Sequence, residues 1–192
     1  MRSRKAKTRN PEETAAALLD AAEAEFNAHG FHGTDSNRIA RRAGYAPQTF
    51  YRHYTDKTAI FLAVYERWWK SEADAIGEIL RARGKAGLGK VADTMIAFHV
   101  KWRGFRRSLR HLAVEDDRVR AARTKARKTQ TATFKTLISK SRRSDAEIYA
   151  ALLAFERLCD AAAEGEFADM GFGKTAAREV VTALLTDTYE KD

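Results

Sequence analysis

Residues 18–61 read LLDAAEAEFNAHGFHGTDSNRIARRAGYAPQTFYRHYTDKTAIF, and the signals in and just before them predict helices in quick succession. A first helix is expected to begin at Pro11, because proline suits the first helical position, with Asn10 as its cap. It is expected to end at His29, since the glycine that follows accepts the left-handed conformation of a helix end.

A tight turn separates the next two predicted helices. Thr34 or Asp35 caps a helix of about eight residues, which stops at Gly44. Pro47 opens a third helix that runs to about Tyr54. Two short helices around a glycine turn form a helix-turn-helix pattern, although an ordinary helical hairpin carries the same signals.

The rest of the chain also has the pattern of helices, because apolar residues recur at helical spacing and nowhere alternate with period two. Asp56 caps a fourth helix, and the glycine-rich stretch 81–90 predicts a loop. Further helices are expected at about 89–102, 103–112, 116–140, 145–164 and 174–190, the last two separated at Gly171–Gly173. The sequence therefore predicts an all-α fold.

Composition narrows the class of protein. The chain has 192 residues, a net charge of +9 and 44% hydrophobic residues, which is enough for a core and too many for a disordered chain. Five Lys or Arg fall in residues 1–10 and ten in residues 118–143, with no acid in either stretch. Such charge indicates a polyanionic partner, although a basic run is also typical of a solvated helix face.

The single cysteine, Cys159, excludes an internal disulfide. No apolar stretch reaches the roughly 20 residues of a membrane helix, and the N-terminus lacks the apolar segment of a signal peptide. We therefore expect a cytoplasmic protein that does not enter a membrane.

Residues 14–65 closely resemble the DNA-binding domain of the TetR family of bacterial transcriptional regulators. The matching positions are Leu18, Ala21, Ala22, Phe26, Gly30, Thr34, Ile39, Ala40, Ala43, Gly44, Thr49, Phe50, Tyr51, His53, Tyr54, Asp56 and Lys57. The departures are Asp35 for the usual Thr or Ser, Ser36 for a commonly apolar residue, Ala46 for Ser and Thr58 for Glu. The resemblance implies a basic arm (1–10), a helix-turn-helix DNA-binding domain (11–56) and a ligand-binding and dimerisation domain (57–192).

A third helix in the major groove would turn its N-terminal residues toward base edges. Gln48 can pair with adenine, Thr49 can meet a thymine methyl group, and Lys57 would place a cation and a helix N-terminus beside a phosphate. The resemblance implies that Tyr51 and His53 reach phosphate oxygens. The full set expected on DNA is Ser36, Tyr45, Ala46, Pro47, Gln48, Thr49, Tyr51, Arg52, His53 and Lys57.

The N-terminal arm resembles the arms of other helix-turn-helix proteins, which reach the minor groove or the backbone, with a solubilising tail as the alternative. Its cations are Arg2, Arg4, Lys5, Lys7 and Arg9.

The helix at 145–164 carries a narrow apolar seam suited to a partner helix. The resemblance implies that the last two helices form a four-helix bundle with their copies in a homodimer, with burial inside one chain as the alternative. The expected interface residues are Ile148, Leu152, Phe155, Cys159, Val180, Val181 and Leu184, with Cys159 acting as a small hydrophobe.

The resemblance also implies a ligand chamber among the middle helices, although aromatic clusters are equally typical of plain core. The expected lining is Trp68, Trp69, Met95, Phe98, His99, Trp102, Phe105, Arg106 and Phe134. Arginine suits a carboxylate or phosphate, so we expect an effector with an apolar body and an anionic group, with Arg103, Arg106 or Arg107 at the mouth of its pocket. In the competing interpretation these cations are solvated or lie near the DNA.

No nucleophile–base pair, metal-ligand cluster or phosphate-cradling loop is recognisable, so we expect no catalytic residue, no metal and no cofactor. The resemblance implies a repressor that binds a palindromic operator in double-stranded DNA as a homodimer and is released by a small-molecule effector. The alternative is a helical interaction protein that uses its basic face for a protein or lipid partner.

Overall fold

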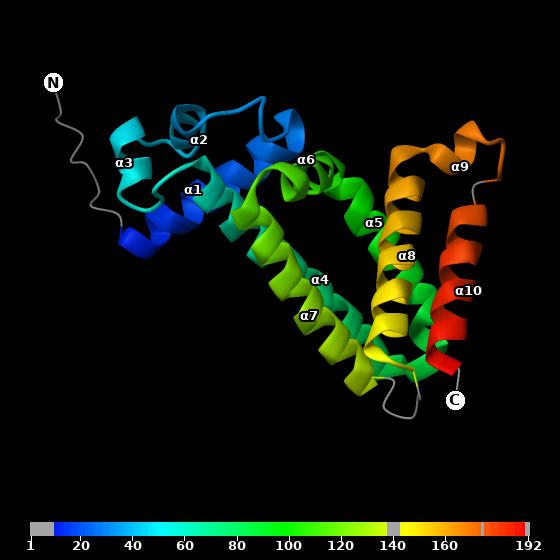
Figure 1. The fold of residues 1–192 in the computed structure, drawn as a ribbon. Coiled ribbons are helices and arrows are strands. Elements are labelled where there is room, and N and C mark those ends of the chain that lie inside the picture. The colour runs from blue at the N-terminus through cyan, green and yellow to red at the C-terminus, as the bar shows by residue number, and fades with distance from the viewer. Residues whose placement is uncertain (1–9, 138–142, 174, 191–192) are drawn as a thin grey trace, which may run out of the picture. The chain divides into compact units, whose positions relative to one another are not determined.

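The computed structural model describes residues 10–137, 143–173 and 175–190. Across these ranges the regular elements are helices, and no strand occurs among them (Figure 1). They are α1 (Pro11–His29), α2 (Ser36–Arg42), α3 (Pro47–Tyr51), α4 (Lys57–Arg83), the 3-10 helix η1 (Gly84–Gly87), α5 (Leu88–Lys101), α6 (Arg103–Glu115), α7 (Asp117–Leu137), α8 (Asp145–Glu164), α9 (Glu166–Asp169) and α10 (Ala176–Glu190). The expected all-α fold is confirmed. None of the described helices is both long and apolar enough to cross a bilayer.

The chain packs as two compact units, Met1–Tyr65 and Glu66–Asp192, and the boundary falls inside α4 rather than at its start. The first turns of α4 belong with the N-terminal unit because their apolar side chains fill its core. Phe61, for example, is fully buried and packs edge-on against Phe26 of α1, with ring centroids 5.1 Å apart.

Local signals place α1 where the sequence predicts it. Pro11 is the first residue of α1, and the Asn10 side chain accepts a hydrogen bond from the Glu12 amide at 3.2 Å. The helix ends at His29, and the Gly30 amide then donates to the Phe26 carbonyl at 2.9 Å. A capped start and a glycine stop therefore set the length of this helix.

The turn between α2 and α3 follows the predicted pattern. Asp35 rather than Thr34 caps α2, accepting from the Arg38 amide at 2.8 Å. Gly44 has a φ of +80°, a left-handed conformation that a side chain disfavours. Pro47 then opens α3, which ends at Tyr51 and is shorter than expected.

The glycine-rich stretch 81–90 is not the loop that the sequence predicts. The helix α4 continues to Arg83, and four residues of 3-10 helix lead directly into α5. Gly87 lies in a crowded position, because a Cβ there would lie 3.0 Å from the Ile79 Cγ2 atom, so a larger residue would require Ile79 to shift. The glycines thus allow a tight corner between two packed helices rather than a flexible connection.

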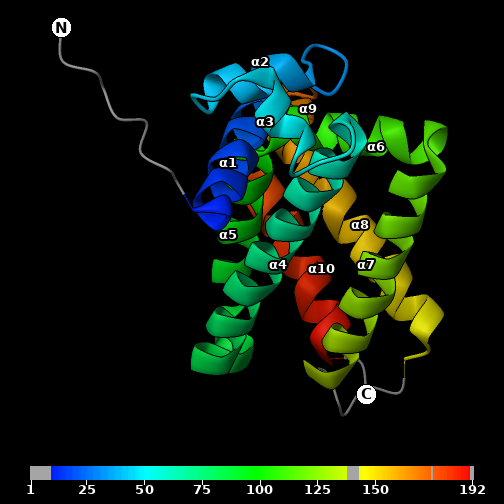
Figure 2. The same ribbon diagram turned by 90° about the vertical axis from the view of Figure 1, so that its left-hand side faces the viewer.

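The second unit is organised around α5, α8 and α10, which pack against one another. Figures 1 and 2 both show α8 beside α10. A break at Gly171–Gly173 separates them as predicted, although the short helix α9 precedes it. The core of this unit contains Leu80, Leu88, Val91, Ala92, Met95, Phe155, Cys159, Val181 and Leu185.

The predicted interface seam of α8 and α10 is mostly this internal core. Ile148, Phe155, Cys159 and Val181 are buried inside their own chain, so the expectation that they face a second subunit is wrong. Leu152 and Leu184 are partly buried and line internal cavities. Val180 is exposed, as an interface residue of an isolated protomer should be. Apolar residues at helical spacing indicate that this side of the helix is buried. They do not show whether it packs against the same chain or against a second subunit.

Candidate nucleic-acid interface and ligand chamber

The exposed side of α3 carries the residues that could read DNA. Gln48 is exposed and Thr49 half-buried, while Phe50 is fully buried and anchors the helix in the core of the first unit. Gln48 makes no side-chain hydrogen bond to any other described residue, so its amide is available to a base edge.

A hydroxyl pair joins α2 to α3. The Ser36 Oγ and Tyr51 Oη atoms lie 2.8 Å apart, and the Tyr51 side chain is 57% exposed. Ser36 is also the first residue of α2, where the Asp35 carboxylate accepts from the Arg38 amide and the amides before it have no intrahelical partner. This pair presents hydroxyl donors next to a helix N-terminus, which suits a phosphate oxygen.

Lys57 has a different role from the one the sequence predicts. Its ammonium donates hydrogen bonds to the carbonyl oxygens of Phe31 at 2.7 Å and Thr34 at 2.8 Å, and lies 4.2 Å from the centroid of the Phe31 ring. Burial lowers the pKa of Lys57, against the opposing effect of Asp35. Lys57 therefore clamps the α1–α2 connection, and the expectation that its charge lies free for a phosphate is wrong.

A buried carboxylate that was not expected from the sequence holds α2 against α1. Glu25 is 2% exposed, accepts hydrogen bonds from the Thr34 hydroxyl at 3.0 Å and the Arg42 Nη1 atom at 3.1 Å, and forms an ion pair with the Arg38 Nε atom at 2.7 Å. Burial would raise the pKa of Glu25, but the hydrogen bonds from Thr34 and Arg42 and the charge of Arg38 outweigh it and lower the pKa. Its spacing from Leu18, at i+7, was the available signal, because it puts an acid on the apolar face of α1.

The remaining residues expected on DNA are distributed around this surface. Ala46 and Arg52 are exposed, and Tyr45, Pro47 and His53 are half-buried. The arm cations Arg2, Arg4, Lys5, Lys7 and Arg9 lie outside the described residues.

Most residues expected to line a ligand chamber form solid core instead. Trp68, Trp102 and Phe105 pack as an aromatic cluster with centroids 5.6 to 6.5 Å apart. Met95 is equally buried, and Phe98 packs against the core of α5, α8 and α10. The expectation that Trp68, Met95, Trp102 and Phe105 line a cavity is wrong, because the helices meet closely around these buried side chains. Phe98 lines a surface hollow of α5 together with Asp93 instead of an internal chamber.

Two small cavities lie instead among α4, α7, α8 and α10. One of about 80 Å³ is lined by Trp69, Glu72, Ala73, Ile76, Arg127, Gln130, Thr133, Phe134, Leu152, Phe155 and Glu156. The other, of about 50 Å³, is lined by apolar residues and Thr188, and it shares Ile76, Phe134, Leu152 and Phe155 with the first. Because the two cavities share these four lining residues, we treat them as one chamber and name it the inner chamber. Trp69 and Phe134 thus line a cavity as expected.

A larger, open groove of about 840 Å³ runs between α7 and α8. Its basic residues are Arg120, Arg123, Arg127, Lys128 and Lys135. Several of them already have partners, since Arg120 pairs with Asp117 at 3.0 Å and Lys135 with Asp145 at 2.5 Å. The groove therefore offers less free positive charge than its composition indicates.

A buried ionic cluster lies beside the inner chamber. The Asp160 carboxylate accepts from the His99 Nδ1 atom at 2.9 Å and from the Arg106 Nε atom at 2.6 Å. Glu156 pairs with Arg106 at 3.4 Å and with Arg127. The guanidinium of Arg106 also lies 4.8 Å from the centroid of the Trp68 ring.

The ion pairs of this cluster shift several pKa values. Burial would raise the pKa of Asp160, but hydrogen bonds from His99 and Arg106 hold it well below its ordinary value. Burial would lower the pKa of His99, yet its hydrogen bond to Asp160 and the adjacent Glu72 carboxylate raise it. Burial likewise acts against Arg106, whose pKa is raised by Glu156 and Asp160. The cluster is therefore a set of mutually stabilised charges.

The arginines expected to hold an anionic effector are engaged elsewhere. Arg103 donates a hydrogen bond to the Ala163 carbonyl at 3.3 Å. Arg107 forms an ion pair with Glu164 at 3.2 Å, and Arg106 forms one with Asp160. The expectation that these arginines stand at the mouth of a pocket is wrong, since acids of α8 neutralise Arg106 and Arg107. No sequence signal could give this result, because the paired residues are more than 50 positions apart.

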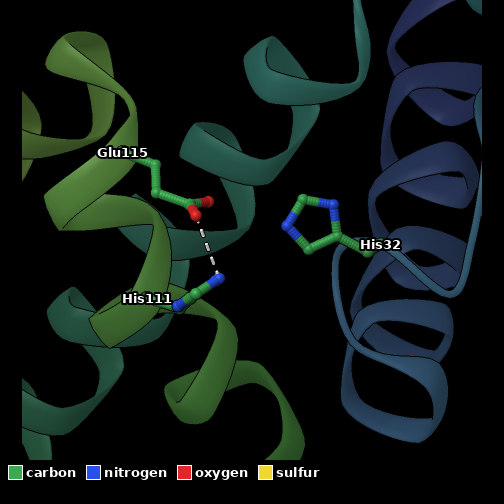
Figure 3. Close-up of side chains that lie close together, drawn as sticks. All are labelled: His32, His111 and Glu115. Atoms are coloured by element: carbon green, nitrogen blue, oxygen red, sulfur yellow. Dashed lines mark ion pairs between the residues drawn. The ribbon is translucent and has the colours of Figure 1, made fainter.

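Another pair on α6 is exposed. The His111 Nε2 atom lies 3.2 Å from a Glu115 carboxylate oxygen one helical turn away (Figure 3). His32, which Figure 3 also draws, belongs to the first unit. Pairs of this kind on a helix surface contribute little to stability.

Comparison with known proteins relates the first unit to a family of bacterial regulators. Residues 18–64 match the sequence model of the bacterial regulatory proteins of the tetR family. A curated relative, an HTH-type transcriptional repressor of Streptomyces coelicolor, is 41% identical over 59 residues, which make up 31% of this chain and 31% of that protein. The chain thus matches about a third of the length of this curated relative.

Solved structures resemble the whole chain. A tetR-family transcriptional regulator from Streptomyces coelicolor has a TM-score of 0.68 at 17% identity, covering 93% of this chain and 80% of that one. A bacterial regulatory protein of the tetR family from Rhodococcus RHA1 has a TM-score of 0.65 at 20% identity, covering 90% and 95%. At such identities the likeness shows the fold. Residues 18–64 thus match the tetR family in sequence, and the whole chain shares the fold of these tetR-family regulators.

Proposed function

We propose that this chain is a transcriptional repressor that binds a palindromic operator in double-stranded DNA as a homodimer and releases it when a small molecule binds the second unit. The observation that carries the proposal is the surface of α3, where Gln48 is exposed and Tyr51 is paired with Ser36. The Streptomyces coelicolor relative, which is a transcriptional repressor, supports the direction of regulation.

The surface of α3 and the start of α2 combine two kinds of contact with DNA. An exposed glutamine amide can form two hydrogen bonds with an adenine in the major groove, which gives sequence preference. The Ser36 and Tyr51 hydroxyls and the backbone N–H groups at the start of α2 suit phosphate oxygens, which fix the register. Arg52, exposed after the end of α3, adds a cation for the backbone.

Dimerisation explains the palindrome, because a two-fold axis presents two identical recognition helices to two half-sites. The surface that supports this proposal differs from the buried seam. On α8 and α10 the large apolar residues that remain exposed are Tyr149, Leu153 and Val180. We assign the dimer contact to the exposed sides of these two helices.

The inner chamber is the proposed effector site. The helix α4 supplies Trp69, Glu72 and Ile76 to this chamber, and its first turns supply Ile60 and Phe61 to the core of the first unit. A ligand that binds one arrangement of α4 better than another would bias the DNA-binding unit. Couplings of this kind amount to about 1–3 kcal/mol.

Selection of bound sequences from random double-stranded DNA tests the proposal, because such a selection requires no assumption about the operator. The expected result is one enriched palindrome, protected in footprinting as two half-sites, with an affinity that falls steeply with salt. A protein that enriches no sequence and binds all duplexes alike would instead be a helical interaction protein with a basic face.

A further inference from the structure

Glu72 is a buried acid in the wall of the inner chamber. It lies on α4, is 6% exposed and has the apolar neighbours Trp69 and Ile76 in the chamber lining. A carboxylate in such surroundings is costly unless a donor or a cation compensates it.

The other acids of the neighbouring cluster have such compensation. Asp160 and Glu156 each pair with a guanidinium, and Glu164 pairs with Arg110 at 2.5 Å. Glu72 differs from them. Its Oε1 atom accepts no hydrogen bond from the described residues, and its recorded ion pair is with the His99 Nε2 atom at 3.5 Å, an imidazole whose pKa it helps to raise, rather than with a guanidinium.

The lining of the inner chamber therefore contains more acidic than basic side chains. Glu72 and Glu156 supply two carboxylates and Arg127 supplies one guanidinium, which Glu156 already binds. The rest of the lining is aromatic or aliphatic, apart from Gln130, Thr133 and Thr188. A cation would meet Glu72, whose recorded ion pair is with the His99 imidazole and not with a guanidinium, whereas an anion would meet two carboxylates.

We propose that the inner chamber binds a ligand with an apolar or aromatic body and a single protonated amine, and that Glu72 is the residue that binds the amine. The inference rests on the proposed function, because it names the chemical class of the effector. It replaces the anionic effector that the arginine-rich sequence predicts. The lining also contains the aromatic residues Trp69 and Phe134, and aromatic rings attract an ammonium group that lies over their faces.

The ligand must open the inner chamber to some extent. Its two parts measure about 80 and 50 Å³, whereas ligand sites commonly span about 300–1,000 Å³. The side chains of Phe134, Leu152 and Phe155 line both parts, so their rotation would join the two volumes. A slender probe with one aromatic ring is therefore the appropriate first ligand.

Three probes that differ only in their head group test the proposal on the full-length protein without DNA. They are 4-phenylbutylamine, 4-phenylbutanol and 4-phenylbutyrate, which at neutral pH supply a cation, a neutral donor and an anion on the same apolar body. Binding is measured by calorimetry and by tryptophan fluorescence. We expect the amine to bind at least about tenfold more tightly than the other two.

The matched variants are Glu72→Gln and Glu78→Gln, which make the same change at a buried and at a more accessible position of α4. The amine should lose its advantage in Glu72→Gln and keep it in Glu78→Gln. The proposal is overturned if the butyrate binds as tightly as the amine, if the advantage survives in Glu72→Gln, or if the amine shows no saturable binding at about 10 mM. Should Glu72→Gln fail to fold, the ranking of the three probes on the unmodified protein decides.

This experiment contains no DNA, and the operator selection contains no ligand. Failure of the amine to bind would therefore leave operator binding intact, and failure of operator binding would leave the ranking of the probes intact.

Discussion

The hydroxyl oxygens of Ser36 and Tyr51 lie 2.8 Å apart, so one hydrogen bond joins the first residue of α2 to the last residue of α3. Ser36 stands where the family commonly has an apolar residue, which means that this bond depends on a departure from the family pattern. It holds the tyrosine hydroxyl next to the backbone N–H groups that begin α2. The two helices can therefore bind one phosphate together.

A double-mutant cycle tests this cooperation. Tyr51→Phe and Ser36→Ala should each weaken operator binding by about 1 kcal/mol for every sequence alike, because each removes a hydroxyl and leaves the base contacts. The double variant should lose little more than either single variant, since the hydroxyls act as a unit. Additive losses measured by fluorescence anisotropy would mean that the two hydroxyls act independently.

Gln48 and Arg52 should affect binding in different ways. Gln48→Ala should relax the preference at one base pair in each half-site by about 1–3 kcal/mol, because it removes a base contact. Arg52→Ala should weaken all sequences alike and reduce the slope of log affinity against log salt by about one. Binding of single-base operator variants over a salt series measures both effects. Identical specificity profiles for the two variants would contradict the assigned roles.

Lys57 should matter for folding before it matters for DNA. Lys57→Met removes the ammonium and leaves the Phe31 and Thr34 carbonyls without their donor, so we expect a loss of about 2 kcal/mol in the free energy of unfolding. Lys70→Met is the control, since Lys70 is an exposed residue of α4 whose ion pair with Glu66 contributes less than about 1 kcal/mol. Urea unfolding without DNA measures both, and equal stability of the two variants would exclude the clamp.

Stability should depend on the proton that His99 binds. The hydrogen bond to Asp160 and the adjacent Glu72 carboxylate outweigh burial and raise the pKa of His99, so the folded state holds this proton more tightly than the unfolded state. The contribution is complete below the ordinary pKa of about 6.5 and is lost as the pH rises through the higher folded pKa. The free energy of unfolding should thus fall with rising pH across this interval.

Urea unfolding from about pH 5.5 to about pH 9 measures this dependence. His99→Gln should flatten the curve in this range, whereas His111→Gln should keep the slope of the unmodified protein, because His111 lies on the exposed surface of α6. A curve that is unchanged in His99→Gln would assign the dependence to another group.

Capping residues, prolines and glycines act on their sequence neighbours, and they predicted the helices of the first unit well. Asn10 and Pro11 start α1, and Gly44 and Pro47 frame the turn, because capping and backbone conformation depend on neighbouring residues. The direction of the Lys57 side chain was missed, since its carbonyl partners lie more than 20 residues earlier in the chain. Helix ends depend on neighbouring residues, whereas a side chain can contact residues that are far away in the sequence.

The second unit illustrates the same limit. The seam of α8 was recognisable from its spacing, but the sequence does not tell whether Phe155 packs against α10 of its own chain or against a partner. Arg106 suggested an anion site because Asp160, 54 residues later, could not be placed beside it. Charged residues indicate a function only once their internal partners are known.

The revised interface leads to a prediction about the dimer. Val180 on α10 is 44% exposed, and Val180→Asp would bury an unpaired carboxylate if α10 packs against its copy. We expect the dimerisation free energy to weaken by about 2–3 kcal/mol, with helical content unchanged because the residue is exposed in the protomer. Sedimentation equilibrium measures the dissociation constant.

Val114→Asp is the matched control for this variant. Val114 is 76% exposed but lies on α6, away from the helices assigned to the contact, so the same substitution should leave the dimer unchanged. The operator affinity of Val180→Asp should depend on protein concentration more steeply than that of Val114→Asp, since a monomer presents only one recognition helix. Equal dimerisation in the two variants would move the contact to another surface of the second unit, and equal disruption would show that any exposed acid has this effect.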